Sequence, residues 1–337
     1  MTVKAPRSWT NLDSHYQKVL ESRWYKSLCI IQDEFTRATS DFYREKGIRF
    51  FHFPITTGSI SSPMGLGSDS TPVKIQIDGV ETYLADSMQF FLEYACRLNK
   101  EGAYYIAPSF RGEKADKRHL SQFLHSEAEI PGGLDDVIEL CQNYLSYLVN
   151  HLLSKCEKEI VDIAGDVNHL TNFLEIAKSI PRCTFDEAVK ILDNSPLYVT
   201  DNGMFRTINS AGEKQLIGHF NGYVWLTNFD HMAVPFYQKF DPKDETKALN
   251  ADLLMGIGET IGSGQRHSNG EEVKKALNIH DVDKKPYEWY IYMKEKYPIQ
   301  TSGFGMGIER FILWLLKHDD IRDCQLLPRF NGIESAF

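Results

Sequence analysis

The stretch from Tyr104 to Glu129, YYIAPSFRGEKADKRHLSQFLHSEAE, decides the fold of this chain. Successive side chains of a strand point to opposite faces, so Arg111 and Glu113 share one face of the first run. In the second run, one face comprises Ser121, Phe123, His125, Glu127 and Glu129, and the other comprises Leu120, Leu124, Ala128 and Ile130. The pattern predicts an antiparallel hairpin with one packed side and one side that carries arginine, acids and an aromatic ring.

That second side is suited to a nucleotide. Arg111 can hold a phosphate through two parallel hydrogen bonds. The Glu113 carboxylate can accept from an exocyclic amine, and Phe123 can stack on a base. Judged by residue types alone, a surface hairpin with solvated charges is the favoured alternative.

The complete string resembles motif 2 of class II aminoacyl-tRNA synthetases, with the aspartyl and asparaginyl branch the closest. The resemblance rests on Phe110-Arg111-Gly112-Glu113, then Arg118-His119-Leu120 and Phe123. It implies that Arg111 holds the α-phosphate and the substrate carboxylate, that Glu113 binds the adenine amine, and that Phe123 stacks on adenine. It also places Arg118 and His119 in the ATP site.

The bulk composition is that of an ordinary globular protein. Of 337 residues, 42% are hydrophobic and 25% are charged. No apolar run is long enough to span a membrane, and six cysteines without CxxC pairing indicate neither a zinc site nor a disulfide framework. A cytoplasmic protein without a membrane partner is therefore expected. The net charge of −9 gives no broadly basic surface and weighs against tRNA.

Residues 9–46 are predicted to form a helix, and Ile48 to Pro54 a strand closed by proline. Helix, strand and proline resemble class II motif 1, so a homodimer through the Pro54 region is expected. The match begins at about residue 30. The family's five-stranded OB-fold, which reads the anticodon, cannot be built from so few residues. We therefore expect residues 1–337 to be one catalytic domain with a short helical extension over residues 1–30.

The GLGSD string that ends at Asp69 falls where synthetases of this class keep an amino-acid-binding loop ending in glutamate. By that resemblance Asp69 binds the substrate ammonium group. The string also resembles the archaeal-type asparagine synthetase related to asparaginyl-tRNA synthetase, an enzyme without an anticodon domain.

The segment from Asp86 to Glu93 resembles the part of the family that recognises the amino-acid side chain, which makes Ser87, Gln89 and Glu93 candidates for substrate binding. Leu92 stands where aspartate-activating members place a lysine. Glu93 can accept from a side-chain amide but not from an ionised carboxylate. Plain aspartate is therefore disfavoured as the substrate.

Two further motifs complete the resemblance. Asp252 and Glu259 occupy the positions of the family's metal-binding acids, and hard carboxylates suit Mg²⁺ bound through ATP phosphates. Arg266 matches the arginine that recognises the side chain. GFGMGIER, which ends at Arg310, resembles motif 3 and implies that Gly307 lies in the ATP site and that Arg310 holds the γ-phosphate.

These motifs predict an α+β protein, an antiparallel sheet flanked by helices, that uses ATP and Mg²⁺. A carboxylate attacks the ATP α-phosphorus to give an acyl-adenylate, with Arg111 and Arg310 as the catalytic groups. The favoured interpretation is a tRNA-independent, asparagine synthetase-like ligase that passes the acyl group to ammonia or another small acceptor. An asparaginyl-tRNA synthetase-like enzyme or tRNA-binding paralogue is the first alternative, indicated by Leu92-Glu93. Activation of an asparagine-type amide, leading to a nitrile, is the second.

Overall fold

The computed structural model describes residues 2–61 and 70–335. Its helices are α1 (Leu12–Glu21), α2 (Arg23–Glu45), α3 (Gln89–Ala95), α4 (Leu134–Ala164), α5 (Asn168–Ile176), α6 (Phe185–Ile191), α7 (Ser210–His219), α8 (Gly270–Ile279), α9 (Glu288–Lys296) and α10 (Ile308–Leu315), with short 3-10 turns η1 (Ser8–Thr10), η2 (His231–Ala233), η3 (Lys285–Tyr287) and η4 (Ile321–Cys324). Its strands are β1 (Arg49–Phe50), β2 (Thr56–Thr57), β3 (Val73–Ile77), β4 (Val80–Leu84), β5 (Ala103–Phe110), β6 (Gln122–Pro131), β7 (Arg182–Thr184), β8 (Val199–Asp201), β9 (Arg206–Ile208), β10 (Tyr223–Thr227), β11 (Phe240–Asp241), β12 (Asp244–Ala248), β13 (Asn250–Met255), β14 (Gly258–Gln265) and β15 (Thr301–Gly307).

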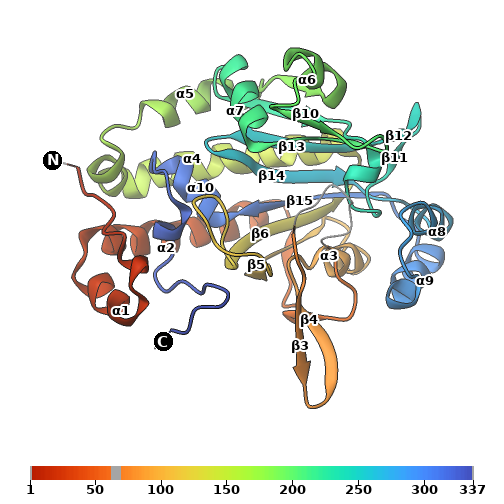
Figure 1. Ribbon diagram of the computed structural model, residues 1–337, viewed down its shortest axis with the longest axis horizontal. Coiled ribbons are helices and arrows are strands. Elements are labelled where there is room, and N and C mark those ends of the chain that lie inside the picture. The colour runs from red at the N-terminus through yellow and green to blue at the C-terminus, as the bar shows by residue number, and fades with distance from the viewer. Residues whose placement is uncertain (1, 62–69, 336–337) are drawn as a thin grey trace.

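The centre of the fold is an eight-stranded sheet in the order β1-β5-β6-β15-β14-β13-β10-β7. Its inner pairs are antiparallel, and only the outermost pairs, β1–β5 and β7–β10, are parallel. The long helices α2 and α4 pack against each other, and α4 covers β14 and β15 (Figure 1). This arrangement confirms the predicted α+β fold with an antiparallel sheet flanked by helices.

The predicted hairpin is formed by β5 and β6, paired from Ala103–Glu129 to Phe110–Gln122. Leu120 and Ala128 are buried in the main core. The acids of β6 point to the opposite face, because side chains alternate along a strand. Arg111 and Glu113 lie just beyond β5, in the connection to β6, and not within the strand as predicted.

The long helix predicted over residues 9–46 is interrupted, and so is the long helical stretch between residues 134 and 176. Ser22 separates α1 from α2, and its hydroxyl accepts from the Trp24 amide at 3.2 Å. Gly165 separates α4 from α5 with a φ of 87°, a conformation that favours glycine. The apolar pattern continues across both breaks, since both helices of each pair face the same core.

The β3–β4 hairpin turns at Asp78-Gly79, where both φ angles are positive, and it projects from the body (Figure 1). The strand predicted from Ile48 to Pro54 is reduced to β1. Among the described residues, no helix is long and apolar enough to cross a membrane.

Candidate active site

A cavity of about 260 Å³ lies on the face of the sheet opposite α4. Side chains from β6, β13, β14 and the start of α3 line it. From the predicted set it brings together Ser87, Gln89, Arg111, Asp252, Glu259 and Arg266. Asp69 lies outside the described residues.

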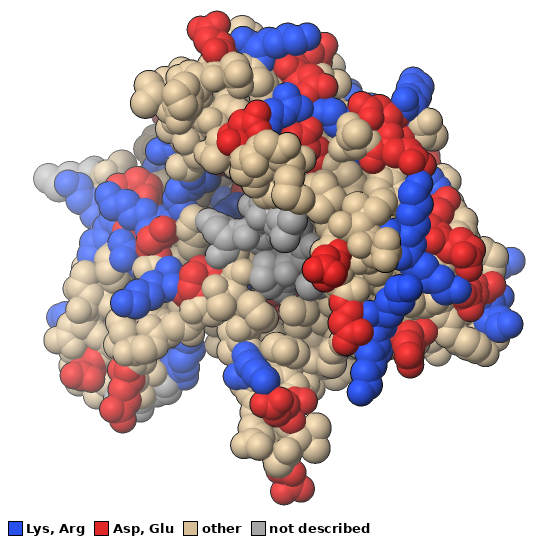
Figure 2. Space-filling view, turned by 45° about the vertical axis from the view of Figure 1, so that its right-hand side comes forward, with Lys and Arg blue, Asp and Glu red and all other residues tan. Residues whose placement is uncertain are grey.

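In Figure 2 the acidic and basic side chains of the visible face are interspersed and form no broad basic surface.

Arg266 forms a buried ion pair with Glu129, with Nη2 and Oε2 3.2 Å apart. Both residues line the cavity, and Arg266 also donates from Nη1 to the Gln238 side-chain oxygen at 3.1 Å. Burial raises the pKa of Glu129 to about 7, although the Arg266 charge opposes the shift. The site therefore has a carboxylate that changes charge near neutral pH.

Glu93 is fully buried and does not line the cavity. It forms an ion pair with Lys294 and accepts from the Tyr290 hydroxyl at 2.9 Å and from Nε2 of Gln89 at 3.0 Å. Burial acts to raise the pKa of Glu93, but Lys294 and Arg266 hold it below its usual value. Since Gln89 lies on the cavity wall, the structure links Glu93 to the cavity through the Gln89 amide.

Four buried ionic groups thus lie together, two on the cavity wall and two directly behind it. Arg266 and Lys294 supply two positive charges, and Glu93 and Glu129 supply two negative charges. We call these four residues the ionic quartet. Its net charge is zero while Glu129 is ionised, so the site is balanced for a neutral polar side chain. An additional buried carboxylate would lack a partner.

A second acid on β6, Glu127, also faces the cavity. It accepts hydrogen bonds from Ser87 Oγ at 2.7 Å and from the Tyr105 hydroxyl, and it pairs with His125 Nδ1 at 3.0 Å. Burial acts to raise the pKa of Glu127, but His125 and the two hydroxyl groups hold it below its usual value. An ionised acid in this position can bind an ammonium group. Period-two alternation placed Glu127 on the correct face, yet nothing in its local sequence pointed to a role.

Of the two arginines predicted to bind phosphates, Arg111 lines the cavity, and Arg310 lies behind Glu259 on the cavity wall. The Arg111 guanidinium lies 5.4 Å from the centre of the Phe123 ring and 4.0 Å from the Glu113 carboxylate. Arg310 donates to the Glu259 carbonyl oxygen at 2.5 Å. Burial and the nearby charges of Arg111 and Arg118 lower the pKa of Arg310. Arginine side chains gathered in one neighbourhood can bind a polyphosphate.

The remaining predicted ATP residues are more peripheral. Arg118 forms an ion pair with Glu213 at 2.6 Å, and the Glu113 carboxylate accepts from the Thr71 amide at 3.0 Å. His119 contacts Asp116 in the β5–β6 connection at 3.1 Å. Gly307 ends β15, directly before α10. None of Glu113, Arg118, His119, Phe123, Gly307 or Arg310 is among the described residues that line the cavity.

Asp252 and Glu259 converge across Gly262. A Cβ atom at Gly262 would lie 2.8 Å from Glu259 Oε1 and 3.7 Å from Asp252 Oδ1. Burial raises the pKa of Asp252 well above its usual range, and the negative charge of Glu259 adds to this effect. Two such carboxylates fit a divalent cation. Within residues 2–61 and 70–335 no group of three or more metal-binding side chains occurs, so a cation here would take further ligands from substrate phosphates or water.

Residues 8–331 match the family model described as tRNA synthetases class II (D, K and N). An asparagine–tRNA ligase of Thermoplasma acidophilum is 29% identical over 92% of this chain and 70% of its own length. The asparagine–tRNA ligase of Pyrococcus furiosus is 33% identical over 77% of this chain but only 59% of its own length. The crystal structure of asparaginyl-tRNA synthetase from Pyrococcus horikoshii complexed with asparaginyl-adenylate has a TM-score of 0.87 and 27% identity, covering 98% of this chain and 74% of that one.

Proposed function

Because this chain belongs to the class II tRNA synthetases of the D, K and N group, we propose that it activates asparagine with ATP and transfers the asparaginyl group to tRNA. The observation that carries the choice of amino acid is the neutral ionic quartet beneath the cavity. The names of the relatives, and the asparaginyl-adenylate in the similar solved structure, support the same substrate.

Two predictions made from the sequence are wrong. The relatives at 29–33% identity are named asparagine–tRNA ligases, which contradicts both the tRNA-independent, asparagine synthetase-like ligase and the expected absence of tRNA. Net charge was misleading because it sums the whole surface, whereas binding to a nucleic-acid backbone depends on local basic groups.

The first reaction forms an asparaginyl-adenylate. The asparagine carboxylate attacks the ATP α-phosphorus, a mixed anhydride bond forms, and the bond to pyrophosphate breaks. No general base is needed because the carboxylate is already ionised. Arg111 stabilises charge that develops at the α-phosphate, and Arg310 holds the γ-phosphate. Asp252 and Glu259 would hold a Mg²⁺ ion, which would supply further neutralisation of the phosphate charge.

Recognition of asparagine divides between the two sides of the cavity. Glu127 binds the ammonium group. Because Gln89 donates from Nε2 to Glu93, its Oε1 is left to accept from the substrate amide nitrogen. Arg266 donates to the substrate amide oxygen. In this arrangement Glu93 and Lys294 set the direction of the Gln89 amide and do not contact the substrate.

In the second reaction, a hydroxyl group of the terminal tRNA ribose attacks the adenylate carbonyl, an ester bond forms, and AMP leaves. The predicted homodimer remains part of the proposal: β1 is an edge strand, its Phe50 is 43% exposed, and Ile55 further along the chain is 42% exposed. The cysteines are all free thiols, which is consistent with the reducing cytoplasm as the setting.

ATP–pyrophosphate exchange tests the first reaction. We expect exchange that depends on asparagine, with little exchange when aspartate replaces it, and loss of exchange in Arg310→Ala. Comparable exchange with aspartate would contradict the proposed specificity. Exchange that persists without any amino acid would contradict the adenylate mechanism.

A further inference from the structure

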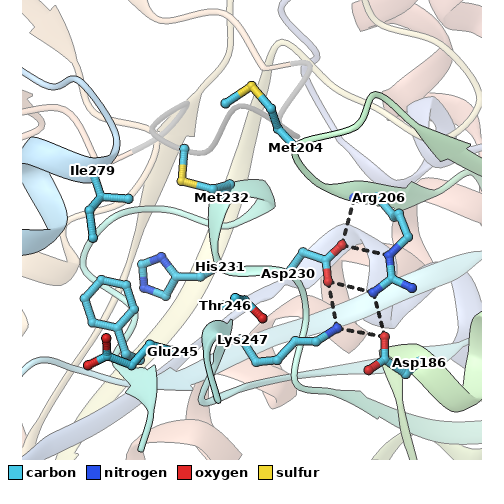
Figure 3. A pocket seen from close by; sticks show the side chains of 11 residues that line it. Asp186, Met204, Arg206, Asp230, His231, Met232, Glu245, Thr246, Lys247 and Ile279 are labelled. Atoms are coloured by element: carbon cyan, nitrogen blue, oxygen red, sulfur yellow. Dashed lines mark hydrogen bonds and ion pairs between the residues drawn. The ribbon is translucent and has the colours of Figure 1, made fainter.

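Figure 3 shows a second cavity, whose volume is about 440 Å³. It shares no lining residue with the first cavity. The described residues that line it belong to α6, α8, η2, β9, β11 and β12 or to the segments beside them. Gln238 lies between the two cavities. Its backbone carbonyl accepts a hydrogen bond from His231, which lines the second cavity, and its side-chain oxygen accepts one from Arg266, which lines the first. The second cavity therefore lies beside the active site but outside it.

One wall of this cavity carries two acids and two cations that neutralise each other. Asp186 Oδ1 lies 2.6 Å from Arg206 Nη2 and 2.7 Å from Lys247 Nζ. Asp230 Oδ1 lies 2.8 Å and 2.7 Å from the same two atoms. Figure 3 shows the four side chains joined in one network. With both cations paired twice, the wall suits neither a phosphate nor a metal ion, and a neutral ligand with hydrogen-bonding groups fits it best.

The rest of the lining is apolar or aromatic. His231 stacks on Phe240 with ring centroids 3.9 Å apart and an angle of 24° between the planes. Burial lowers the pKa of His231 to about 3, so its ring is neutral. Met204, Met232 and Ile279 complete this side, and Met204 is 66% exposed at the surface. Methionine and histidine side chains of this kind can cover a flat aromatic ring.

We propose that this second cavity binds an unstacked nucleobase, and that guanine is the base its polar wall matches. Guanine offers two adjacent N–H donors beside a carbonyl oxygen. Both cations contact Asp186 through Oδ1, and the side chain is still 49% exposed, so its carboxylate can accept from the two donors. The Lys247 ammonium group has three protons and gives two to the aspartates, so the third can go to the carbonyl oxygen.

The base could come from a free nucleoside or from an unpaired nucleotide of an RNA, and both present the same edge. The inference does not depend on the proposed aminoacylation. It rests on a cavity that the adenylate reaction does not use.

Titration calorimetry with guanosine, adenosine, cytidine and uridine tests the site. Guanosine should bind about tenfold more tightly than the others, because only its edge satisfies both the Asp186 and Lys247 groups. Asp186→Asn should weaken the binding of guanosine about tenfold. Met204→Glu places a charge over the exposed mouth of the cavity without disturbing the core, and it should weaken guanosine binding to a similar extent. Asp33→Asn, which alters another exposed aspartate–arginine pair on α2, is the matched control and should leave binding unchanged.

A second titration, with a tRNA transcript, separates the two sources. Weaker RNA binding by Met204→Glu assigns the base to the RNA, whereas unchanged RNA binding together with weakened guanosine binding assigns it to a free nucleoside. The proposal is overturned if no nucleoside gives saturable binding. It is also overturned if guanosine binds wild type, Asp186→Asn and Met204→Glu with equal affinity.

Discussion

Substitution of Lys294 and Glu93, singly and together, changes the charge of the ionic quartet in known steps. Both side chains are fully buried. Besides its ion pair with Glu93, the Lys294 ammonium donates to the His267 carbonyl at 2.6 Å. Lys294→Met leaves the quartet with one excess negative charge, Glu93→Gln leaves one excess positive charge, and the double variant restores neutrality.

The structure gives a magnitude for each change. Breaking a buried ion pair from one side leaves the other charge unpaired and should lower the free energy of unfolding by about 3–5 kcal/mol. The double variant should recover most of that loss, because neutral groups of similar size often replace a buried pair at little cost. For substrate choice, Glu93→Gln should improve aspartate relative to asparagine by about 1–3 kcal/mol, or about 5- to 150-fold.

Urea unfolding of the four proteins measures the stability cycle, and pyrophosphate exchange with asparagine and aspartate measures selectivity. We expect strong coupling between the two substitutions and a return of asparagine preference in the double variant. Additive losses of stability in the double variant would refute the pairing. An unchanged ratio of asparagine to aspartate activity in Glu93→Gln would refute the charge-balance argument, whatever the effect on stability.

Three other predictions follow from the site. The pKa of Glu129 is raised to about 7, so Glu129 is ionised and the quartet is neutral above pH 7. Below pH 7 the protonation of Glu129 leaves one excess positive charge, so aspartate should bind better as the pH falls from 8 to 6. Calorimetry that gives a constant ratio of asparagine affinity to aspartate affinity over this range would contradict the prediction. Glu259→Gln should raise the Mg²⁺ concentration for half-maximal exchange, because one hard anionic ligand is lost, and an unchanged Mg²⁺ titration would remove Glu259 from the metal site. Arg111→Ala and Arg310→Ala should each lower adenylate formation by about two orders of magnitude, measured as AMP release, and rates near wild type would exclude both arginines from the phosphate site.

The parts of the site that lie on one strand were predictable from sequence. Period-two alternation along β6 placed Glu127 and Glu129 on a common face, and the structure lines the cavity with both. Arg266, Asp252 and Glu259 were identified through resemblance alone, because single charges carry no periodic signal. The break at Ser22 within the helix predicted over residues 9–46 was missed because the apolar face continues across it.

The partners in the ionic quartet could not be predicted. Arg266 and Glu129 are 137 residues apart, and their pairing depends on how the strands align. Lys294 is followed by Glu295 and Lys296 in a helix and therefore has the sequence context of a solvated residue. Only the packing of α9 buries it against Glu93. The resemblance likewise indicated direct contact between Glu93 and the substrate, because the packing around Glu93 cannot be read from the sequence. The structure places Gln89 between Glu93 and the cavity.

Charging of a tRNA with the asparagine anticodon tests the central claim most directly. The wild-type protein is incubated with the transcript, ATP, Mg²⁺ and labelled asparagine or aspartate, and the aminoacylated RNA is separated on an acid gel. We expect asparaginyl-tRNA to accumulate and aspartyl-tRNA to be absent. Labelled asparaginyl-adenylate without any charged tRNA, or charging by aspartate at a comparable rate, would contradict the account.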